Sequence, residues 1–473
     1  MPLPMSPTDS MFLHAEQPER PVNIGALALL RPPEGGDARD VRGMFATALR
    51  RREVAPLWRR RPHRSITSLG QWCWRTDADI DLDYHVRHSG LPSPAGHAEL
   101  WDLVSRVHSV PLDRTRPLWQ FHLIEGLADG RYAVYVKIHH ALADGVSAMR
   151  LLRRTVSADA DQRGMPALWE VSDGERGAGG GFRALDAARG MIGGAEALAG
   201  VGPALLDTAW RAMRHRGGPL TLAAPHTPLN VPISGARSFA GCSFALDRLR
   251  LVAKHTDATL NDVVLTMCAG ALRRYLLDRN ALPAASLMAM VPVSLRGDDP
   301  VDTADVVPGN KVGTLMCSLG THLDDPAERL AVVQTSMRDG KAALAGRGQL
   351  QVLAMSALGA APLALAMTVG RAPAPLRPPN VLISNVPGPS GPSYWNGARV
   401  EALYPLSVPV DGQTLNISCT SVDDQVSFGL TGCRRAVPRI GALADYLGRE
   451  LDLLDAFHRI GSRRDRRPRR PPG

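Results

Sequence analysis

Several common enzyme signatures are missing from this chain of 473 residues. It has no G-x-S-x-G nucleophile elbow, no H-E-x-x-H zinc motif and no phosphate-binding P-loop, which argues against a serine esterase, a metalloprotease and an NTPase. No recognisable nucleic-acid-binding signature is present either. The chemistry must therefore be sought in other patterns.

Cysteine is scarce and dispersed. The six cysteines include no C-x-x-C pair, so we expect neither a disulfide framework nor a cysteine-bound zinc, and no metal site. The first residues do not form a charged stretch followed by an apolar run and a cleavage site. These observations predict a protein of the reducing cytoplasm.

Long uninterrupted apolar runs are missing as well. Residues 350–369 approach the roughly 20 apolar residues that span a bilayer, but polar residues and Pro362 interrupt the run. We therefore predict a buried or interfacial pair of helices there, and no transmembrane segment.

Positive charge, by contrast, is concentrated. The formal net charge is +9 at pH 7, and arginines gather at residues 50–52, 59–61 and 463–470. Such clusters suit phosphates, anionic lipid head groups or nucleic acid. A solvated basic face explains the cluster near the start of the chain, or the one at its end, equally well. Because no nucleic-acid signature accompanies them, an anionic co-substrate or a membrane surface is the preferred partner.

The chain is long enough for two domains, since single hydrophobic cores stop growing beyond about 250–300 residues. Strand, helix and turn signals alternate in both halves, which predicts an α/β fold with mixed sheets. We predict an N-terminal half at residues 1–156, a Gly-rich linker, helix and crossover at 157–235, a C-terminal half at 236–460 and a disordered basic tail at 461–473.

Local patterns predict individual elements. An Asp129-Gly130 pair between the apolar runs 118–124 and 131–138 indicates a β-hairpin. Residues 79–86 alternate between polar and apolar, as an edge strand does, and residues 98–109 have helical spacing. In the second half we expect strands at 238–245, 288–294 and 311–318, and helices at 246–254, 261–277 and 440–457.

The hairpin delivers the most informative stretch, residues 139–145 (HHALADG). His140 falls on the same side of the alternating run as four apolar residues, and His139 falls on the other side. An imidazole at the end of an aliphatic face, with an acid four residues later, could be a general base in a dry site. Two structural histidines are the alternative, and Asp144 is equally suited to cap the helix that follows. The apolar residues on the His140 side are Tyr132, Val134, Val136 and Ile138.

Further motifs accompany the histidine pair in a fixed order along nearly the whole chain, apart from the linker and the tail. They are Ser6-Pro7-Thr8-Asp9 with Phe12-Leu13, residues 81–86, Pro117-Leu118-Trp119, Asn261-Asp262, Pro292-Val293-Ser294 with Arg296, Gly309-Asn310, and Ser384-Asn385-Val386-Pro387-Gly388. HHxxxDG alone also occurs in condensation domains and plant acyltransferases. The combination resembles the bacterial wax ester synthase/acyl-CoA:diacylglycerol acyltransferase family.

This resemblance implies two domains like chloramphenicol acetyltransferase, with an active-site tunnel between them. It makes His140 the general base and His139 an orienting residue. It also implies that Asp144, followed by Gly145, shapes the loop through an ion pair with an arginine. The Pro117-Leu118-Trp119 motif is implied to be structural or close to the site; for Trp119, core packing and an acyl-pocket role are both open.

The corresponding reaction is the transfer of a long-chain acyl group from acyl-CoA to diacylglycerol or to a long-chain alcohol. His140 would take the hydroxyl proton as the oxygen attacks the thioester, and thiolate leaves without a covalent enzyme intermediate. Arg296 is the candidate partner of Asp144. Asn261 is a candidate donor near the reacting carbonyl, although Asn261-Asp262 is equally explained by helix capping. Asn310 is a further candidate among the residues that bind substrate or support the site.

Two rival hypotheses remain. A condensation-type enzyme would require acyl groups on a carrier protein, and a non-catalytic lipid-body protein would retain the fold without turnover. We expect no bound cofactor, since acyl-CoA is a co-substrate, and we expect peripheral association with a membrane or lipid inclusion. The acceptor alcohol, the acyl chain length and the oligomeric state are left open by the sequence.

Overall fold

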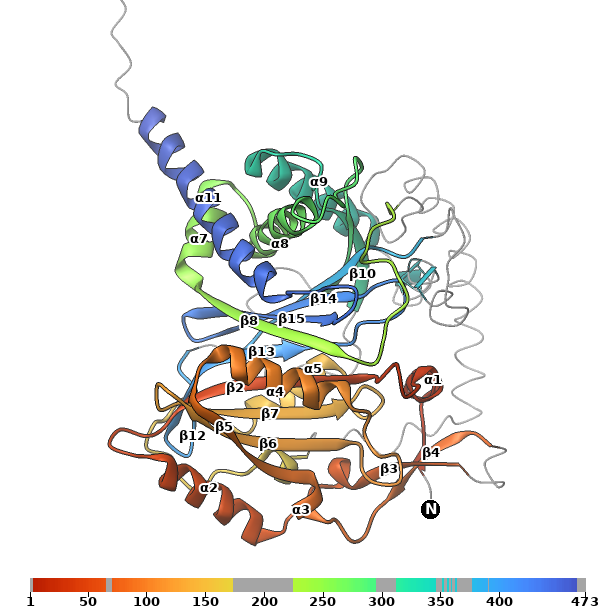
Figure 1. Ribbon diagram of the computed structural model, residues 1–473, viewed down its shortest axis with the longest axis vertical. Helices are drawn as coiled ribbons and strands as arrows, with labels where there is room; N and C mark the ends of the chain where they lie inside the picture. The colour runs from red at the N-terminus through yellow and green to blue at the C-terminus, as the bar shows by residue number, and fades with distance from the viewer. Residues whose placement is uncertain are drawn as a thin grey trace, which may run out of the picture.

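The computed structural model describes residues 3–64, 70–172, 224–294, 312–345, 377–389 and 391–465, together with residues 351, 352, 355, 356, 359, 362 and 363. Two lobes, each built on a six-stranded mixed sheet, are stacked on one another (Figure 1). A small three-stranded sheet lies at one end of the N-terminal lobe, near helix α1 (Pro7–Ala15). The predicted mixed α/β architecture with two lobes is confirmed.

The sheet of the N-terminal lobe has the order β12-β13-β2-β7-β6-β5. Its neighbours are antiparallel except for the parallel pair β5 and β6. The strands are β2 (Asn23–Arg31), β5 (Val86–Ala95), β6 (Trp119–Leu127), β7 (Tyr132–His139), β12 (Tyr394–Trp395) and β13 (Ala398–Leu406).

Both faces of this sheet are covered, and all eight residues of β7 are buried. One face packs against α2 (Ala38–Arg51), α5 (Gly145–Arg153) and the 3-10 turn η3 (Leu168–Glu170). The other face packs against α4 (His97–Ser109) and the C-terminal lobe. A strand covered on both faces reads as a nearly continuous apolar run, because neither side meets water.

Residues from the far end of the chain complete the N-terminal sheet. β13 pairs antiparallel with β2, and Arg31 forms an ion pair there with Glu401, 370 positions away in the sequence. The segment that we assigned to the C-terminal half therefore contributes β12 and β13 to the N-terminal lobe.

The C-terminal sheet has the order β10-β9-β11-β14-β15-β8, with β11 parallel to both its neighbours. Its strands are β8 (Arg237–Ala245), β9 (Met288–Ser294), β10 (Val312–Ser318), β11 (Val381–Val386), β14 (Leu415–Val422) and β15 (Gln425–Cys433). The helices packed around it are α7 (Leu246–His255), α8 (Leu260–Leu277), α9 (Pro326–Leu344) and α11 (Gly441–Asp465).

Several smaller elements are formed by the first 85 residues of the chain, in the N-terminal lobe. The three-stranded sheet has the order β1-β4-β3; in the chain, a 3-10 turn directly precedes β3 and a short helix follows β4. These elements are β1 (Leu3–Pro4), η1 (Pro56–Arg59), β3 (Arg60–Arg64), β4 (Trp72–Thr76) and α3 (Leu82–His85).

Helix α4 joins the lobes by capping the free edge of strand β8. The hydroxyl of Ser105 accepts the backbone N–H of Phe239 at 2.8 Å, and that of Ser109 accepts the backbone N–H of Arg237 at 2.8 Å. Each serine donates in turn to a backbone carbonyl one helical turn back. Edge-strand donors that would otherwise need water are thereby satisfied inside the protein.

The lobes also meet where β13 passes over β15 and β8. A Cβ atom on Gly429 would lie 1.8 Å from the carbonyl oxygen of Pro405, and one on Gly241 would lie 2.8 Å from the ring of Tyr404. Real Cβ atoms do not approach backbone that closely, so glycine permits this contact between the sheets.

Most of the locally predicted elements are confirmed. The hairpin is formed by β6 and β7, the helix predicted at 98–109 is α4, and the helix after residue 145 is α5. In the second half, β8, β9, β10, α7, α8 and α11 fall where strands and helices were expected.

The edge strand predicted at residues 79–86 is wrong. Residues 82–85 form helix α3, and the edge strand β5 begins at Val86. The carboxylate of Asp81 accepts the backbone N–H of Tyr84 at 3.2 Å and caps this turn. A local side-chain cap of this kind competes successfully with an extended backbone despite the alternating pattern.

Two boundaries also differ from prediction. Residues 157–172, placed in the linker, pack into the N-terminal lobe: Trp169 is buried, and its carbonyl accepts the backbone N–H of Ala55 at 2.8 Å. Helix α11 continues to Asp465, five residues into the predicted disordered tail. The predicted helical stretch at 182–214, most of 350–369, and Arg296 and Asn310 lie outside the described residues.

Candidate active site

The histidine pair lies where β7 leaves the sheet. The backbone N–H of His139 donates to the carbonyl of Leu118 at 3.0 Å, and that of His140 donates to the carbonyl of Val22 at 3.0 Å. Leu142 closes the turn by donating to the carbonyl of His139 at 2.9 Å. The strands on both sides of β7 therefore fix the position of this turn.

His140 is half-buried against an aromatic neighbour. The ring of Phe12, on α1, lies 4.2 Å from the imidazole between centroids. Burial lowers the pKa of His140, and the nearby carboxylates of Asp144 and Asp9 only partly oppose that shift. Its Nδ1 is buried and has no hydrogen-bond partner among the described residues. At neutral pH the ring is thus uncharged and can accept a proton.

His139 is completely buried and has a different set of contacts. Its Nδ1 accepts the backbone N–H of Ala141 at 3.0 Å, so Nε2 carries the proton of the neutral ring. Nε2 lies 3.4 Å from Oε1 of Glu16. Nδ1 is thus engaged by the turn, and the buried Nε2 faces the Glu16 carboxylate without a hydrogen bond among the described residues, which suits an orienting role.

The two faces of β7 separate as the alternation predicts, but both are buried. Tyr132, Val134, Val136 and Ile138 belong to one core cluster and Ala133 and Tyr135 to another. On the latter face, the ammonium group of Lys137 donates to the backbone carbonyl of Val107, at 2.9 Å, and to that of Val110. Burial lowers the pKa of Lys137 to about 7. β7 ends at His139, so His140 is the first residue beyond the strand.

Asp144 is exposed and caps α5, because its carboxylate accepts the backbone N–H of Ser147 at 2.7 Å. The capping interpretation is therefore confirmed. The predicted ion pair with Arg296 stays a prediction, since Arg296 is not among the described residues. At Gly145 an added Cβ would find open space, so steric crowding does not explain the glycine.

The Pro117-Leu118-Trp119 motif supports the histidine turn from the neighbouring strand. All three residues are buried, and the carbonyl of Leu118 holds His139. The indole N–H of Trp119 donates to the carbonyl of Trp58 at 2.7 Å, and His85 stacks on the indole ring at 4.4 Å. These contacts assign Trp119 to the core.

The Asn261-Asp262 pair lies in the first turn of α8, in the C-terminal lobe. The carboxylate of Asp262 accepts the backbone N–H of Thr259 at 2.9 Å, and the Thr259 hydroxyl accepts the N–H of Asp262 at 3.2 Å. This reciprocal capping box gives Asp262 a structural role. The described contacts do not join Asn261 to His140, so its role near the reacting carbonyl stays a prediction.

The loop after β11 contacts the end of α5. The guanidinium of Arg153 donates to the backbone carbonyl of Pro387 at 3.0 Å and also to that of Gly388. A Cβ on Gly388 would lie 1.6 Å from the carbonyl oxygen of Ser421. The Ser384 to Gly388 motif thus packs the C-terminal lobe against the helix that follows the histidine turn.

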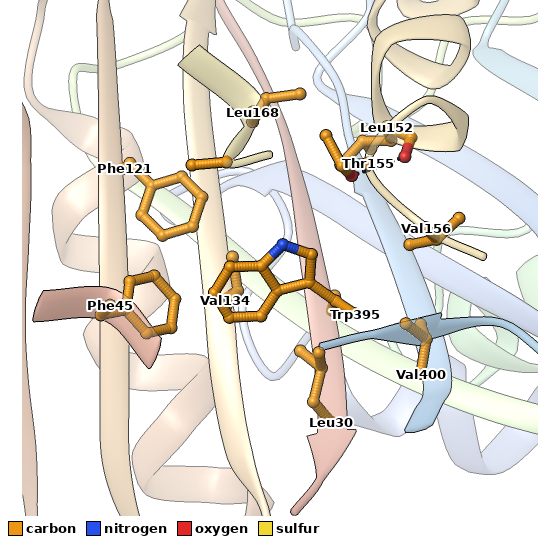
Figure 2. A pocket seen from close by; sticks show the side chains of 12 residues that line it. Leu30, Phe45, Phe121, Val134, Leu152, Thr155, Val156, Leu168, Trp395 and Val400 are labelled. Atoms are coloured by element: carbon orange, nitrogen blue, oxygen red, sulfur yellow. Dashed lines mark hydrogen bonds between the residues drawn. The ribbon is translucent and has the colours of Figure 1, made fainter. Parts of the chain in front are cut away.

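An apolar cavity of about 60 Å³ lies in the N-terminal lobe on the α5 side of the sheet (Figure 2). Ligand pockets are commonly about 300–1,000 Å³, so this space cannot take up a long acyl chain as it stands. The side chains pointing into it include Phe45, Phe121, Val134, Leu168 and Trp395, and Thr155 supplies a hydroxyl. We assign it no ligand.

Sequence reasoning did not find Glu16, Arg114 or Val22. Glu16 and Val22 contact the histidine turn, and Arg114 binds Glu16, only because α1, the residue before β2 and the segment before β6 meet there in the fold. No local spacing rule points to them, whereas Phe12 belongs to the Phe12-Leu13 motif.

In the described part of the chain, no group of three or more His, Cys, Asp and Glu side chains is arranged to hold a metal ion. Nor does any described helix have the length and apolar character needed to cross a membrane.

Comparisons with known families cover most of the chain. A model described as the wax ester synthase/diacylglycerol acyltransferase catalytic domain matches residues 5–264. A second model, the WS/DGAT C-terminal domain, matches residues 308–455.

Individual relatives agree with these matches. A Mycobacterium tuberculosis protein whose name describes it as a diacylglycerol O-acyltransferase is 62% identical over 466 residues, which are 98% of this chain and 92% of that protein. Another protein from the same organism, with the same activity in its name, is 45% identical over 459 residues, covering 97% of this chain and 99% of its own.

Solved structures show the same likeness in three dimensions. The wax ester synthase/diacylglycerol acyltransferase from Marinobacter aquaeolei VT8 is 36% identical with a TM-score of 0.76, covering 96% of this chain and 99% of that one. A starter condensation domain of rhizomide synthetase, in complex with C8-CoA and Leu-SNAC, reaches a TM-score of 0.57 at 15% identity, covering 97% and 94%. At that identity the likeness concerns the fold alone.

Proposed function

Because the chain belongs to the wax ester synthase/diacylglycerol acyltransferase family, we propose that it transfers a fatty acyl group from acyl-CoA to the hydroxyl of diacylglycerol. Long-chain alcohols are a second class of acceptor and would give wax esters. The observation that carries this proposal is His140, a half-buried imidazole that the turn after β7 holds against Phe12 and that burial keeps uncharged at neutral pH.

His140 acts as the general base. Its Nδ1 is enclosed, so the opposite nitrogen, Nε2, takes the proton of the acceptor hydroxyl as that oxygen attacks the thioester carbonyl. The tetrahedral intermediate collapses by breaking the carbon–sulfur bond, and the departing thiolate receives the proton from the imidazolium. Ester and free CoA are released, and a positioned base of this kind contributes roughly 10² to 10⁴ in rate.

The supporting residues act around this base. His139 orients the turn through the hydrogen bond that its Nδ1 accepts from Ala141, with Nε2 facing the Glu16 carboxylate. We retain Asp144 as an ion-pair partner of Arg296 in addition to its cap, and Asn261 as a polar donor near the carbonyl. Asn310 stays a candidate among the residues that bind substrate or support the site.

We also propose that the protein works at a membrane or lipid-inclusion surface without spanning it. Both acceptors are apolar and partition into lipid, and the net charge of +9 favours anionic head groups. Sedimentation with vesicles containing phosphatidylglycerol tests this, compared with vesicles of phosphatidylcholine alone. Recovery entirely in the supernatant with both would contradict it.

The deciding assay offers purified protein palmitoyl-CoA with diacylglycerol or hexadecanol in parallel and follows thiol release together with ester formation. We expect turnover without any carrier protein, a loss of roughly 10² to 10⁴ in His140→Ala, and a smaller loss in His139→Ala. His88→Ala, a half-exposed histidine paired with Glu125, is the matched control and should keep full activity. Activity only with a carrier-bound acyl group would favour the condensation-type reaction, and no turnover with intact binding would favour a lipid-binding protein.

A further inference from the structure

Glu16 is a buried carboxylate beside the histidine turn that the proposed reaction does not use directly. It ends helix α1, and its side chain is 3% exposed. Burial alone would raise its pKa, but the adjacent His139 and the hydrogen bonds from Val22 and Arg114 lower the pKa below its ordinary value. Glu16 therefore carries a full negative charge at neutral pH.

One oxygen of Glu16, Oε1, lies close to two residues that hold His140 in place: Val22 and His139. Oε1 accepts the backbone N–H of Val22 at 3.1 Å, and the carbonyl of the same Val22 accepts the backbone N–H of His140 at 3.0 Å. Oε1 also lies 3.4 Å from Nε2 of His139, whose Nδ1 holds the backbone of Ala141. The backbone of His140 is thus held from β2 on one side and from its own turn on the other.

The second oxygen of Glu16 is held by Arg114. The guanidinium donates to Oε2 from Nε at 3.0 Å and from Nη2 at 2.9 Å. It also donates to the backbone carbonyls of Leu13, at 3.0 Å, and of Glu16, at 3.3 Å. Arg114 therefore fixes the end of α1, and α1 carries the Phe12 ring that covers His140.

From this geometry we propose that Glu16 is a positioning residue for acyl transfer, which acts through Val22, His139 and α1 to hold the imidazole of His140 in place. The inference rests on the proposed function. It assigns Glu16 no contact with substrate and no proton transfer of its own.

A matched control exists in the same lobe. Glu170 is 5% exposed, pairs with Arg51 through both oxygens at 2.7 Å, and accepts a backbone N–H, from Ala167, at 2.7 Å. Arg51 and Arg114 are also equally exposed, at 31% and 33%. Glu170→Gln therefore reproduces the loss of a buried carboxylate–arginine pair without touching the histidine turn.

The experiment compares Glu16→Gln, Glu16→Ala and Glu170→Gln with the unmodified protein, by palmitoyl-CoA and diacylglycerol kinetics across pH and by thermal unfolding. For Glu16→Gln we expect kcat to fall roughly 10- to 100-fold, the range known for outer hydrogen-bond partners of metal-bound histidines. KM for palmitoyl-CoA should be unchanged. Glu16→Ala should be worse than Glu16→Gln, because the amide oxygen can still accept from Val22.

The pH profile separates positioning from a general loss of stability. When the turn loosens, water reaches His140, and the acidic limb of kcat/KM should move upward toward the ordinary histidine pKa of about 6.5. Glu170→Gln should lower the melting temperature similarly but leave kcat and the limb unchanged. Unchanged kcat and pH profile in Glu16→Gln, with His140→Ala inactive, would overturn the positioning role alone; an unmodified protein without turnover would overturn the proposed function.

Discussion

The aromatic ring of Phe12 lies 4.2 Å from the imidazole of His140, with 31° between the ring planes. Helix α1 thus supplies a cover for the imidazole from a segment more than a hundred residues away in the chain. This contact is part of the burial that lowers the pKa of His140.

Replacing Phe12 should consequently raise the pKa of the base. In Phe12→Ala we expect the acidic limb of kcat/KM to shift upward by up to about one pH unit, the ordinary spread of histidine pKa values in proteins. In the pH range between the acidic limb of the unmodified protein and that of Phe12→Ala, the variant should be less active. Its activity should return at higher pH, where His140 is again uncharged. Phe244→Ala, which removes a ring contact with Phe428 in the other lobe, should leave the limb in place.

Asp144 allows its two roles to be separated. Asparagine caps helices as well as aspartate does, so Asp144→Asn should keep the free energy of unfolding, whereas Asp144→Ala should lose about 1 kcal/mol. If the negative charge also pairs with Arg296, Asp144→Asn should lower kcat despite its intact cap. Equal kcat in Asp144→Asn and the unmodified protein would refute the ion pair.

The serine caps between α4 and β8 should stabilise the junction of the lobes. Ser105→Ala leaves the buried N–H of Phe239 without its acceptor, which should lower the free energy of unfolding by about 1–3 kcal/mol. Urea unfolding measures this loss. Thr47→Ala removes a similar hydroxyl bond to the preceding helical turn on an exposed surface, and it should cost within about 0.5 kcal/mol.

His122 should make the fold sensitive to acid. Burial, aided by the positive charges of Arg87 and Lys137, lowers its pKa from 6.5 to about 3. Between these pH values the unfolded chain binds a proton that the folded protein does not, so the free energy of unfolding falls as pH falls, by about 1.4 kcal/mol per pH unit. His122→Leu should reduce that slope by this amount in urea titrations between about pH 4 and pH 6; an identical slope would contradict the prediction.

Local chemistry made part of this fold predictable from the sequence. Asp129-Gly130 identified the β6–β7 hairpin, and alternation assigned the residues of β7 to two faces. The same alternation misled at residues 79–86, because the Asp81 side chain closes a helical turn there. Local rules succeed where no side chain competes for the backbone.

The rest depends on contacts between distant segments. Nothing near Glu16 in the sequence indicates that its carboxylate meets His139, since that contact requires α1 and β7 to be packed together. The capping roles of Asp144 and Asp262 were both foreseen as alternatives, because caps are local. The roles of Arg296 and Asn310 remain predictions.

The placement of β13 has a consequence for synthesis on the ribosome. Strand β2 is made early, yet its partner β13 follows some 370 residues later. Until β13 emerges, β2 has one edge of the growing N-terminal sheet unpaired, and such an edge is a template for pairing with other chains. Truncation before β12 should therefore yield an aggregating fragment rather than a smaller working lobe, and a nascent chain should require protection until nearly all of it has been made.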